Sequence, residues 1–240
     1  MNILSIGNSF SEDAQRYIHQ IARSAKETVN TYNLYIGGCP LCYHFRNLKG
    51  DEKRYMLGVN GHMSYFFVTI REALLACDWE VVTIQQASHF SIDYNTYQPY
   101  LNEIVAEIRS LCPKAKVAIH QTWAYEEGSQ RLTEELGYKT REDMFSDIKS
   151  AYEKAAEDVS ADLVIPSGML MEKLTENGIK KVHRDTFHAS LGIGRYAIGL
   201  LWYAFLTGKN VDDVSFCDFD EAVTREEIEI AKKTVKAVLK

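Results

Sequence analysis

A serine near the start of the chain stands where a short apolar run gives way to a helical pattern. The run Asn2 to Ile6 ends at Gly7, and apolar residues with helical spacing follow from Glu12. Ser9 therefore lies at an expected strand-to-helix turn, where backbone N–H groups of the helix N-terminus can stabilise an oxyanion formed on an attacked carbonyl. Ser9 and Glu12 also have the spacing of a capping box, in which the serine only closes the helix. Ser9 is thus a candidate nucleophile with a competing structural role.

An aspartate and a histidine, three residues apart, lie near the other end of the chain. Asp185 and His188 precede the apolar stretch Ala189 to Leu206, which has the pattern of a long helix. A carboxylate at this spacing can accept the imidazole Nδ1–H, which leaves Nε2 free to take a proton from a serine. The alternative is an ordinary helix cap followed by a structural histidine. If the fold brings these residues to Ser9, the three side chains can perform nucleophilic acyl transfer.

Thiol chemistry is a second possibility. Cys39 and Cys42 form a C-x-x-C motif, which could be a redox pair or half of a zinc site. A structural zinc needs two further ligands, and the sequence has no second C-x-x-C. We therefore expect no metal and no organic cofactor, and we place both cysteines at the rim of the serine site. The five cysteines are an odd number, so a reducing cytoplasm is the expected location.

The elements that must position these residues alternate along the chain. The expected strands are Asn2 to Ile6, Val29 to Ile36, Glu80 to Ile84, Lys116 to His120 and Asp162 to Ile165. The expected helices are Glu12 to Lys26, Asn102 to Leu111, Glu142 to Glu157, Ala189 to Leu206 and Thr224 to Leu239. Short apolar strands between helices predict a parallel sheet covered on both faces, with sites at the carboxyl ends of its strands. We predict one α/β domain over residues 1–240 with about five strands, in which Cys42 to Ser64 and Ala124 to Thr140 are insertions.

Composition excludes several classes of partner. The 240 residues carry a net charge of −6, and no run of Lys or Arg is longer than two, so nucleic acid is not an expected partner. No apolar run approaches the roughly 20 residues that a membrane-spanning helix requires, so no membrane is expected. The N-terminus begins directly with the first expected strand instead of an export signal.

The serine and histidine motifs together resemble those of a known family. Gly7-Asn8-Ser9-Phe10 after the first strand, and Asp185-x-x-His188 before the last helices, resemble the first and last blocks of the SGNH (GDSL-like) hydrolases. Asn8 stands where that family more often has Asp. The resemblance, closest to a bacterial branch of the family, implies a flavodoxin-like three-layer α/β/α fold. It also implies that Ser9 is the nucleophile, His188 the base and Asp185 the residue that orients the base.

The family's two middle blocks supply the oxyanion hole, and the resemblance extends to them in part. Gly38, after the second strand, is expected to donate its backbone N–H, with Gly37 as the alternative. The third block is usually Gly-x-Asn-Asp, but the stretch after the third strand here contains neither Gly nor Asn. Because a glutamine amide can donate as an asparagine does, we expect Gln86 to replace the asparagine, with Gln85 and Ser88 as alternatives.

Aromatic and charged residues after the fourth strand are candidates for the substrate site. Trp123, with Tyr125 and Phe90, could stack on a sugar ring or an acyl group, or could simply pack in the core. The charged stretch Glu126 to Asp143 is either a solvated surface or one wall of the cleft.

The function expected from these features is that of a serine esterase. The enzyme would remove an acyl group, which we expect to be acetyl, from a carbohydrate or a similar small polar molecule through a Ser-His-Asp triad. Because the third block is absent, a non-catalytic ligand-binding module on the same fold is the alternative, and a thiol-dependent activity at Cys39 and Cys42 is a third hypothesis. The sequence leaves open the acyl chain length, the alcohol and the oligomeric state.

Overall fold

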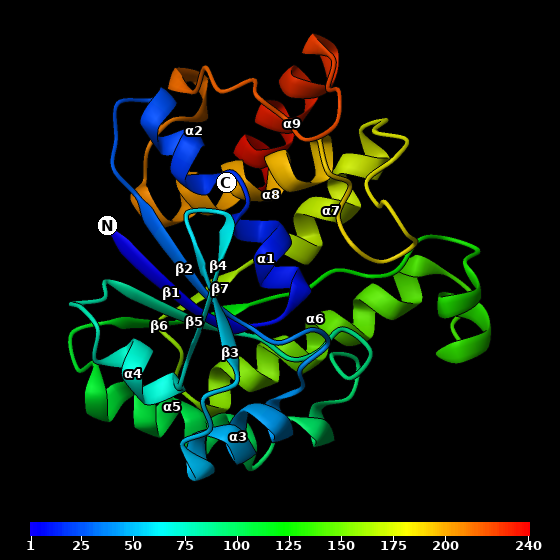
Figure 1. Ribbon diagram of the computed structural model, residues 1–240. Coiled ribbons are helices and arrows are strands. Elements are labelled where there is room, and N and C mark those ends of the chain that lie inside the picture. The colour runs from blue at the N-terminus through cyan, green and yellow to red at the C-terminus, as the bar shows by residue number, and fades with distance from the viewer.

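The computed structural model describes all 240 residues, and its centre is one seven-stranded sheet (Figure 1). The strands are β1 (Asn2–Gly7), β2 (Asn30–Tyr35), β3 (Tyr55–Val59), β4 (His62–Val68), β5 (Val81–Ile84), β6 (Lys116–His120) and β7 (Leu163–Ile165). Their order across the sheet is β4-β3-β2-β1-β5-β6-β7. Five neighbouring strands are parallel to one another, namely β2, β1, β5, β6 and β7. β3 runs antiparallel to β2, and β4 runs antiparallel to β3. β1 therefore lies at the centre of the sheet.

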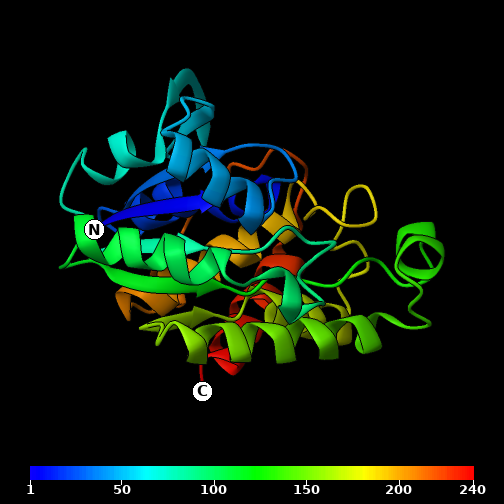
Figure 2. The same cartoon turned by 90° about the horizontal axis from the view of Figure 1, so that it is seen from below.

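Helices cover both faces of this sheet (Figures 1 and 2). One face carries α1 (Ser9–Gln15), α2 (Ile18–Ser24), α7 (Ser167–Glu176), α8 (Ile193–Thr207) and α9 (Arg225–Val238). The other face carries α3 (Leu41–Gly50), α4 (Ile70–Leu74), α5 (Tyr100–Leu111) and α6 (Arg141–Asp158). Three short helical turns, η1 (Tyr94–Thr96), η2 (Arg131–Glu135) and η3 (Val211–Asp213), lie in the connections. The three-layer α/β fold predicted from the sequence is confirmed.

Burial explains why the central elements are apolar on all sides. All four residues of β5 are buried, because helices cover both faces of the sheet at this strand. Helix α8 is apolar almost all round, because it packs between the helices α1, α2, α7 and α9. The buried apolar side chains form one contiguous core. No helix combines the length and the apolar character that crossing a bilayer would require.

The predicted number of about five strands is wrong because of the β3–β4 hairpin. This hairpin and α3 occupy most of the segment that we expected to be an insertion, Cys42 to Ser64. β4 does contain an apolar run, Tyr65 to Val68, but every residue of the strand is exposed or half-buried, so the strand does not belong to the buried core. The sequence does contain a signal, since Asn60 and Gly61 form the two-residue turn with φ of 51° and 82°. An Asn-Gly pair is the strongest short signal of such a hairpin.

The helix predicted from Ala189 begins four residues later, at Ile193. Ala189 and Ser190 do not join the helix because their backbone N–H groups donate to Asp13 and to the carbonyl of Val182. The helix predicted over residues 12–26 is also divided, into α1 and α2, and α7 was not predicted.

Candidate active site

Segments that follow several parallel strands meet at the carboxyl edge of the sheet. Ser9 follows β1, Gly38 follows β2 and Ser88 follows β5, while His188 comes from the loop before α8. These residues line one cavity of about 300 Å³. The carboxyl edge of a parallel sheet is where α/β proteins commonly place their sites.

Ser9, His188 and Asp185 form one line of hydrogen bonds. The Oγ of Ser9 lies 2.7 Å from Nε2 of His188, and Nδ1 of His188 lies 2.8 Å from Oδ2 of Asp185. The other carboxylate oxygen of Asp185 accepts the backbone N–H of His188 at 2.9 Å. Because both oxygens bind the same residue, the carboxylate fixes the ring's orientation and favours the tautomer with its proton on Nδ1.

The electrostatic surroundings keep Asp185 ionised. Burial raises the pKa of its carboxyl group, but the hydrogen bonds from the side chain and backbone of His188 and the charge of Arg184 outweigh this effect. The net pKa of Asp185 is lower than its ordinary value. A carboxylate that stays charged can stabilise an imidazolium formed at His188.

Ser9 does not cap helix α1, so the capping-box interpretation of Ser9 and Glu12 is wrong. The cap is Asn8, whose Oδ1 accepts the N–H of Phe10 at 3.0 Å, while the hydroxyl of Ser11 accepts the N–H of Asn8 at 3.1 Å. The Ser9 hydroxyl is therefore free to bind His188. The turn is tight, because a Cβ on Gly7 would lie 2.2 Å from the Ser11 hydroxyl oxygen.

Gln85 binds the turn that carries Ser9 and does not line the cavity. Its Nε2 donates to Asn8 Oδ1 at 2.9 Å, and its Oε1 lies 2.5 Å from Nδ1 of His120. Burial lowers the pKa of His120 to about 3, so this ring is neutral and donates from Nδ1 while Nε2 accepts from Ser167 at 3.1 Å. The prediction that Gln85 is an alternative oxyanion donor is wrong, because its amide is committed to Asn8.

Gln86 is likewise unavailable as an oxyanion donor. Its Oε1 accepts the N–H groups of Leu41 and Ala87, each at 2.9 Å. Its Nε2 donates to the carbonyl and the hydroxyl of Thr96 at 3.0 and 3.1 Å. The prediction that Gln86 replaces the asparagine of the third block is therefore wrong, because both ends of its amide already form hydrogen bonds with neighbouring segments. Of the three predicted alternatives, Ser88 alone lines the cavity.

Two donors remain at the cavity wall beside Ser9. Gly38 has φ of +61°, a conformation that favours glycine, and its N–H binds no acceptor within the chain. Ser88 exchanges a hydrogen bond of 2.9 Å with the hydroxyl of Tyr125. The N–H of Ser9 itself belongs to the first turn of α1, where backbone donors have no partner within the helix.

Trp123 lies beneath the cavity, so its predicted contact with substrate is wrong. The side chain is completely buried and stacks on Phe10 with ring centroids 4.3 Å apart. Its Nε1–H donates to the carbonyl of Phe187 at 2.8 Å and so fixes the loop that carries His188. Sequence reasoning missed Phe187 and Tyr35, which do line the cavity.

Arg131 was also not singled out from the sequence. It belongs to the charged stretch Glu126 to Asp143, which we considered as a wall of the cleft, and it does line the cavity. The signal was weak because charged residues in a loop are usually solvated.

The C-x-x-C motif lies outside this cavity, and its predicted place at the rim is wrong. Cys39 is buried, and burial raises the pKa of its thiol to about 12, so it is not a thiolate at neutral pH. Cys42 is exposed and forms no disulfide. No group of three or more His, Cys, Asp or Glu side chains is arranged to hold a metal ion.

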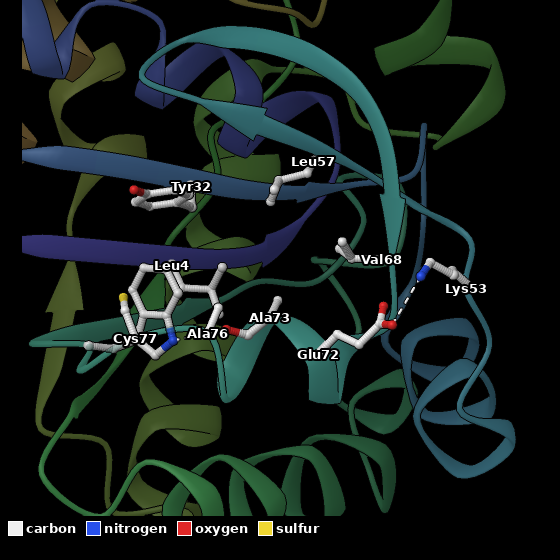
Figure 3. Close-up of a pocket in the computed structure, with 10 residues that line it drawn as sticks. Leu4, Tyr32, Lys53, Leu57, Val68, Glu72, Ala73, Ala76 and Cys77 are labelled. Atoms are coloured by element: carbon white, nitrogen blue, oxygen red, sulfur yellow. Dashed lines mark hydrogen bonds and ion pairs between the residues drawn. The ribbon is translucent and has the colours of Figure 1, made fainter.

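A second cavity, of about 420 Å³, lies between the sheet and α4 (Figure 3). Its lining is mostly apolar, with an ion pair of 3.0 Å between Lys53 and Glu72. Its one thiol is that of Cys77, whose pKa is raised by burial and by the charges of Glu80 and Asp78. Because no base activates this thiol, the cavity beside Ser9 is the better candidate for an active site.

Comparisons with known proteins agree with this fold. The family model described as "Domain of unknown function (DUF4886)" matches residues 2–238. A solved structure of a DUF4886 family protein from Bacteroides uniformis is 30% identical, with a TM-score of 0.93 over 100% of this chain and 95% of that one. No match was found among curated protein sequences.

More distant solved structures place the fold in a larger group. A protein from Slackia heliotrinireducens assigned to the SGNH hydrolases is 21% identical, with a TM-score of 0.62 over 86% of this chain and 98% of that one. A lipase/acylhydrolase from Enterococcus faecalis is 14% identical, with a TM-score of 0.55 over 86% and 95%. At these identities the likeness shows that the fold is shared with SGNH hydrolases.

Proposed function

Because the chain belongs to the DUF4886 family and shares its fold with SGNH hydrolases, we propose that it is a serine hydrolase that cleaves carboxylic esters. The observation that carries the proposal is the hydrogen-bonded line from Ser9 through His188 to Asp185, with distances of 2.7 and 2.8 Å. A serine whose hydroxyl meets an oriented imidazole is the arrangement that activates a nucleophile.

In the first step, Ser9 Oγ attacks the ester carbonyl while His188 Nε2 takes the hydroxyl proton. Asp185 stabilises the imidazolium that forms. The oxyanion of the tetrahedral intermediate is held by the N–H groups of Ser9 and Gly38, with the hydroxyl of Ser88 as the remaining donor. His188 then gives its proton to the departing alcohol oxygen, and the acyl group stays on Ser9.

In the second step, water attacks the acyl-enzyme and His188 takes a proton from it. Collapse of the new tetrahedral intermediate returns that proton to Ser9 and releases the carboxylic acid. The two steps use only groups of this chain and water.

The cavity supports a small, polar substrate. Its volume is about 300 Å³, and eight of its twelve lining residues are not hydrophobic. We therefore propose a short acyl group, which we take to be acetyl, on a carbohydrate or a similar small polar alcohol. The phenol of Tyr35 and the aromatic ring of Tyr125, which line the cavity, could contact such an alcohol.

Replacing Ser9 tests the proposal directly. We expect Ser9→Ala to lower kcat/KM for p-nitrophenyl acetate by about a thousandfold or more, as in other triad deletions. The matched control is Ser150→Ala, which removes an exposed hydroxyl on α6 and leaves activity unchanged. Thermal midpoints of all three proteins establish that they are folded.

A fluorophosphonate probe provides an independent readout, since it labels an activated serine. We expect rapid labelling of the wild type and of Ser150→Ala but not of Ser9→Ala. Equal hydrolysis by wild type and Ser9→Ala, or none above buffer in either, would mean that the chain is a ligand-binding module instead.

A further inference from the structure

Twelve residues line the cavity beside Ser9, and Arg131 is the one Arg, Lys, Asp or Glu among them. The neighbouring histidine does not add a second cation, because burial, and next to it the charge of Arg131, lower the pKa of His89. The wall beside Ser9 therefore presents a single fixed positive charge. A cation in an otherwise uncharged cavity favours a ligand with negative charge.

The backbone that carries Arg131 is held firmly. Leu132, the next residue, is completely buried, and its carbonyl accepts the N–H of Tyr138 at 3.0 Å. The segment is tied to the loop of His188 because the N–H of Glu126 donates to the carbonyl of Thr186 at 2.7 Å. Arg131 thus keeps a defined position relative to the proposed base.

The guanidinium of Arg131 has its hydrogen-bond donors free. It lies over the ring of Phe187, 4.2 Å from the centroid, and makes no hydrogen bond within the chain. Glu135 forms an ion pair with Arg131 at 3.8 Å, which is beyond hydrogen-bond distance, and both side chains are about half exposed, so water weakens this pair. An arginine stacked on an aromatic ring is oriented for bidentate binding of an oxyanion group.

The position of Arg131 relative to His188 indicates which part of the ester it meets. The ring of Phe187, on which Arg131 stacks, lies with its centroid 3.8 Å from that of His188. His188 must protonate the departing alcohol oxygen, so the alcohol lies on its side of the cavity. Gly38, the expected oxyanion donor, lines the same cavity and follows a different strand, β2.

We propose that the cavity accepts esters whose alcohol part carries a carboxylate or a similar oxyanion group, and that Arg131 binds this group. This inference rests on the proposed esterase function and names its substrate class. Arg131 selects the substrate by a charge-assisted hydrogen bond to a group remote from the bond that breaks.

Two pairs of substrates test the proposal. The alcohol-side pair is 4-acetoxybenzoate and its neutral methyl ester, and the acyl-side pair is 4-nitrophenyl hemisuccinate and 4-nitrophenyl butyrate. For each pair the measured quantity is the ratio of kcat/KM for the charged ester to that for the neutral ester. Because the two alcohols differ in acidity, only the change of this ratio between protein variants is interpreted.

We expect Arg131→Gln to lower the alcohol-side ratio by about tenfold to a hundredfold, the usual range for a hydrogen bond to a charged group. Arg131→Lys keeps the charge but loses the forked geometry of the guanidinium. Its alcohol-side ratio should therefore lie between those of the wild type and Arg131→Gln. The matched control is Arg23→Gln, which removes the same charge from the exposed end of α2 and should leave the ratio unchanged.

An alcohol-side ratio that changes less than about twofold in Arg131→Gln would overturn the proposal, as would a fall confined to the acyl-side pair. Failure of the proposed function is distinguishable, because it means equal hydrolysis of the neutral esters by wild type and Ser9→Ala, or none above buffer in either. In that event, calorimetry measures the binding of 4-acetamidobenzoate, an analogue that is not cleaved, and so tests whether Arg131 binds the carboxylate. Binding at least tenfold tighter to wild type than to Arg131→Gln supports the site, and equal or undetectable binding contradicts it.

Discussion

At the scale of single residues, the side chain of Asn8 makes contacts that an aspartate could not. Its Oδ1 accepts from Phe10 and Gln85, while its Nδ2 donates to the carbonyl of Cys39 at 3.2 Å. Asn8 therefore joins the turn that carries Ser9 to the turn that carries Gly38. The Asp that the SGNH hydrolase motif more often has at this position accepts hydrogen bonds only when it is ionised, so it could not donate to Cys39.

We expect Asn8→Asp to lower kcat/KM for p-nitrophenyl acetate by about tenfold to a hundredfold. The substitution sets a carboxylate oxygen against the Cys39 carbonyl, and losing a buried hydrogen bond costs about 1–3 kcal/mol. The matched control is Asn210→Asp, an exposed cap of η3 that keeps its hydrogen bond to Asp212. Unchanged activity in Asn8→Asp would mean that the link between the two turns has no catalytic consequence.

The contacts of a residue could be predicted from the sequence when its partners lie close to it along the chain. Asp185 and His188 interact with one another over three residues, so their spacing alone indicated the contact. The partners of Gln86 include Leu41, 45 residues away, and no pattern near Gln86 indicates that its amide is already used. The catalytic roles of Ser9, His188 and Asp185 themselves stay predictions until the variants are measured.

At the scale of elements, Asp13 joins helix α1 to the loop before α8. It lies four residues after Ser9 and is completely buried. Its carboxylate accepts from Arg184 at 2.8 and 3.0 Å, from Arg195 at 2.8 Å and from the backbone of Ala189 at 3.0 Å. The helix that begins at Ser9 and the loop that carries His188 are therefore held to each other by one carboxylate.

We expect Asp13→Asn to destabilise the protein by about 3–5 kcal/mol in urea unfolding, because it leaves two guanidinium groups without their buried partner. Asp220→Asn is the control, since Asp220 also binds two arginines, Arg16 and Arg195, but is partly exposed. Its effect should be clearly smaller. Equal losses in the two variants would contradict a special role for the buried carboxylate.

Apolar patterns predicted the elements of the core better than those at its margin. Strands β1, β5 and β6 are largely buried and were predicted within one or two residues. The hairpin β3–β4 was missed although both strands contain apolar residues, because most of it lies in the segment that we interpreted as an insertion. α1 and α2 were predicted as one helix because apolar spacing continues across the break between them.

At the scale of the whole molecule, three buried histidines make the fold sensitive to acid. Burial lowers the pKa of His44 and His120 to about 3 each, and that of His183 to about 4. In the unfolded chain these groups titrate near pH 6.5. Below that pH the unfolded state binds more protons than the folded state, so acid favours unfolding.

Lowering the pH from 7 to 5 should therefore reduce the free energy of unfolding by about 2 kcal/mol for each of these histidines. Urea unfolding at several pH values measures this slope. His44→Gln should make the slope shallower, whereas His62→Gln, which changes an exposed histidine, should not. A slope that is the same in all three proteins would exclude His44 as a cause of the acid sensitivity.

The order in which the chain is made separates the proposed nucleophile from its base in time. Ser9 belongs to the first turn after the central strand, and His188 follows it by 179 residues. At about 5–20 residues per second, a ribosome needs about 10–40 s to synthesise the intervening chain. During that interval the growing polypeptide already contains Ser9 but lacks the imidazole that would activate it. If the chain has the proposed esterase activity, this activity therefore begins only after His188 has been synthesised and has folded against Ser9.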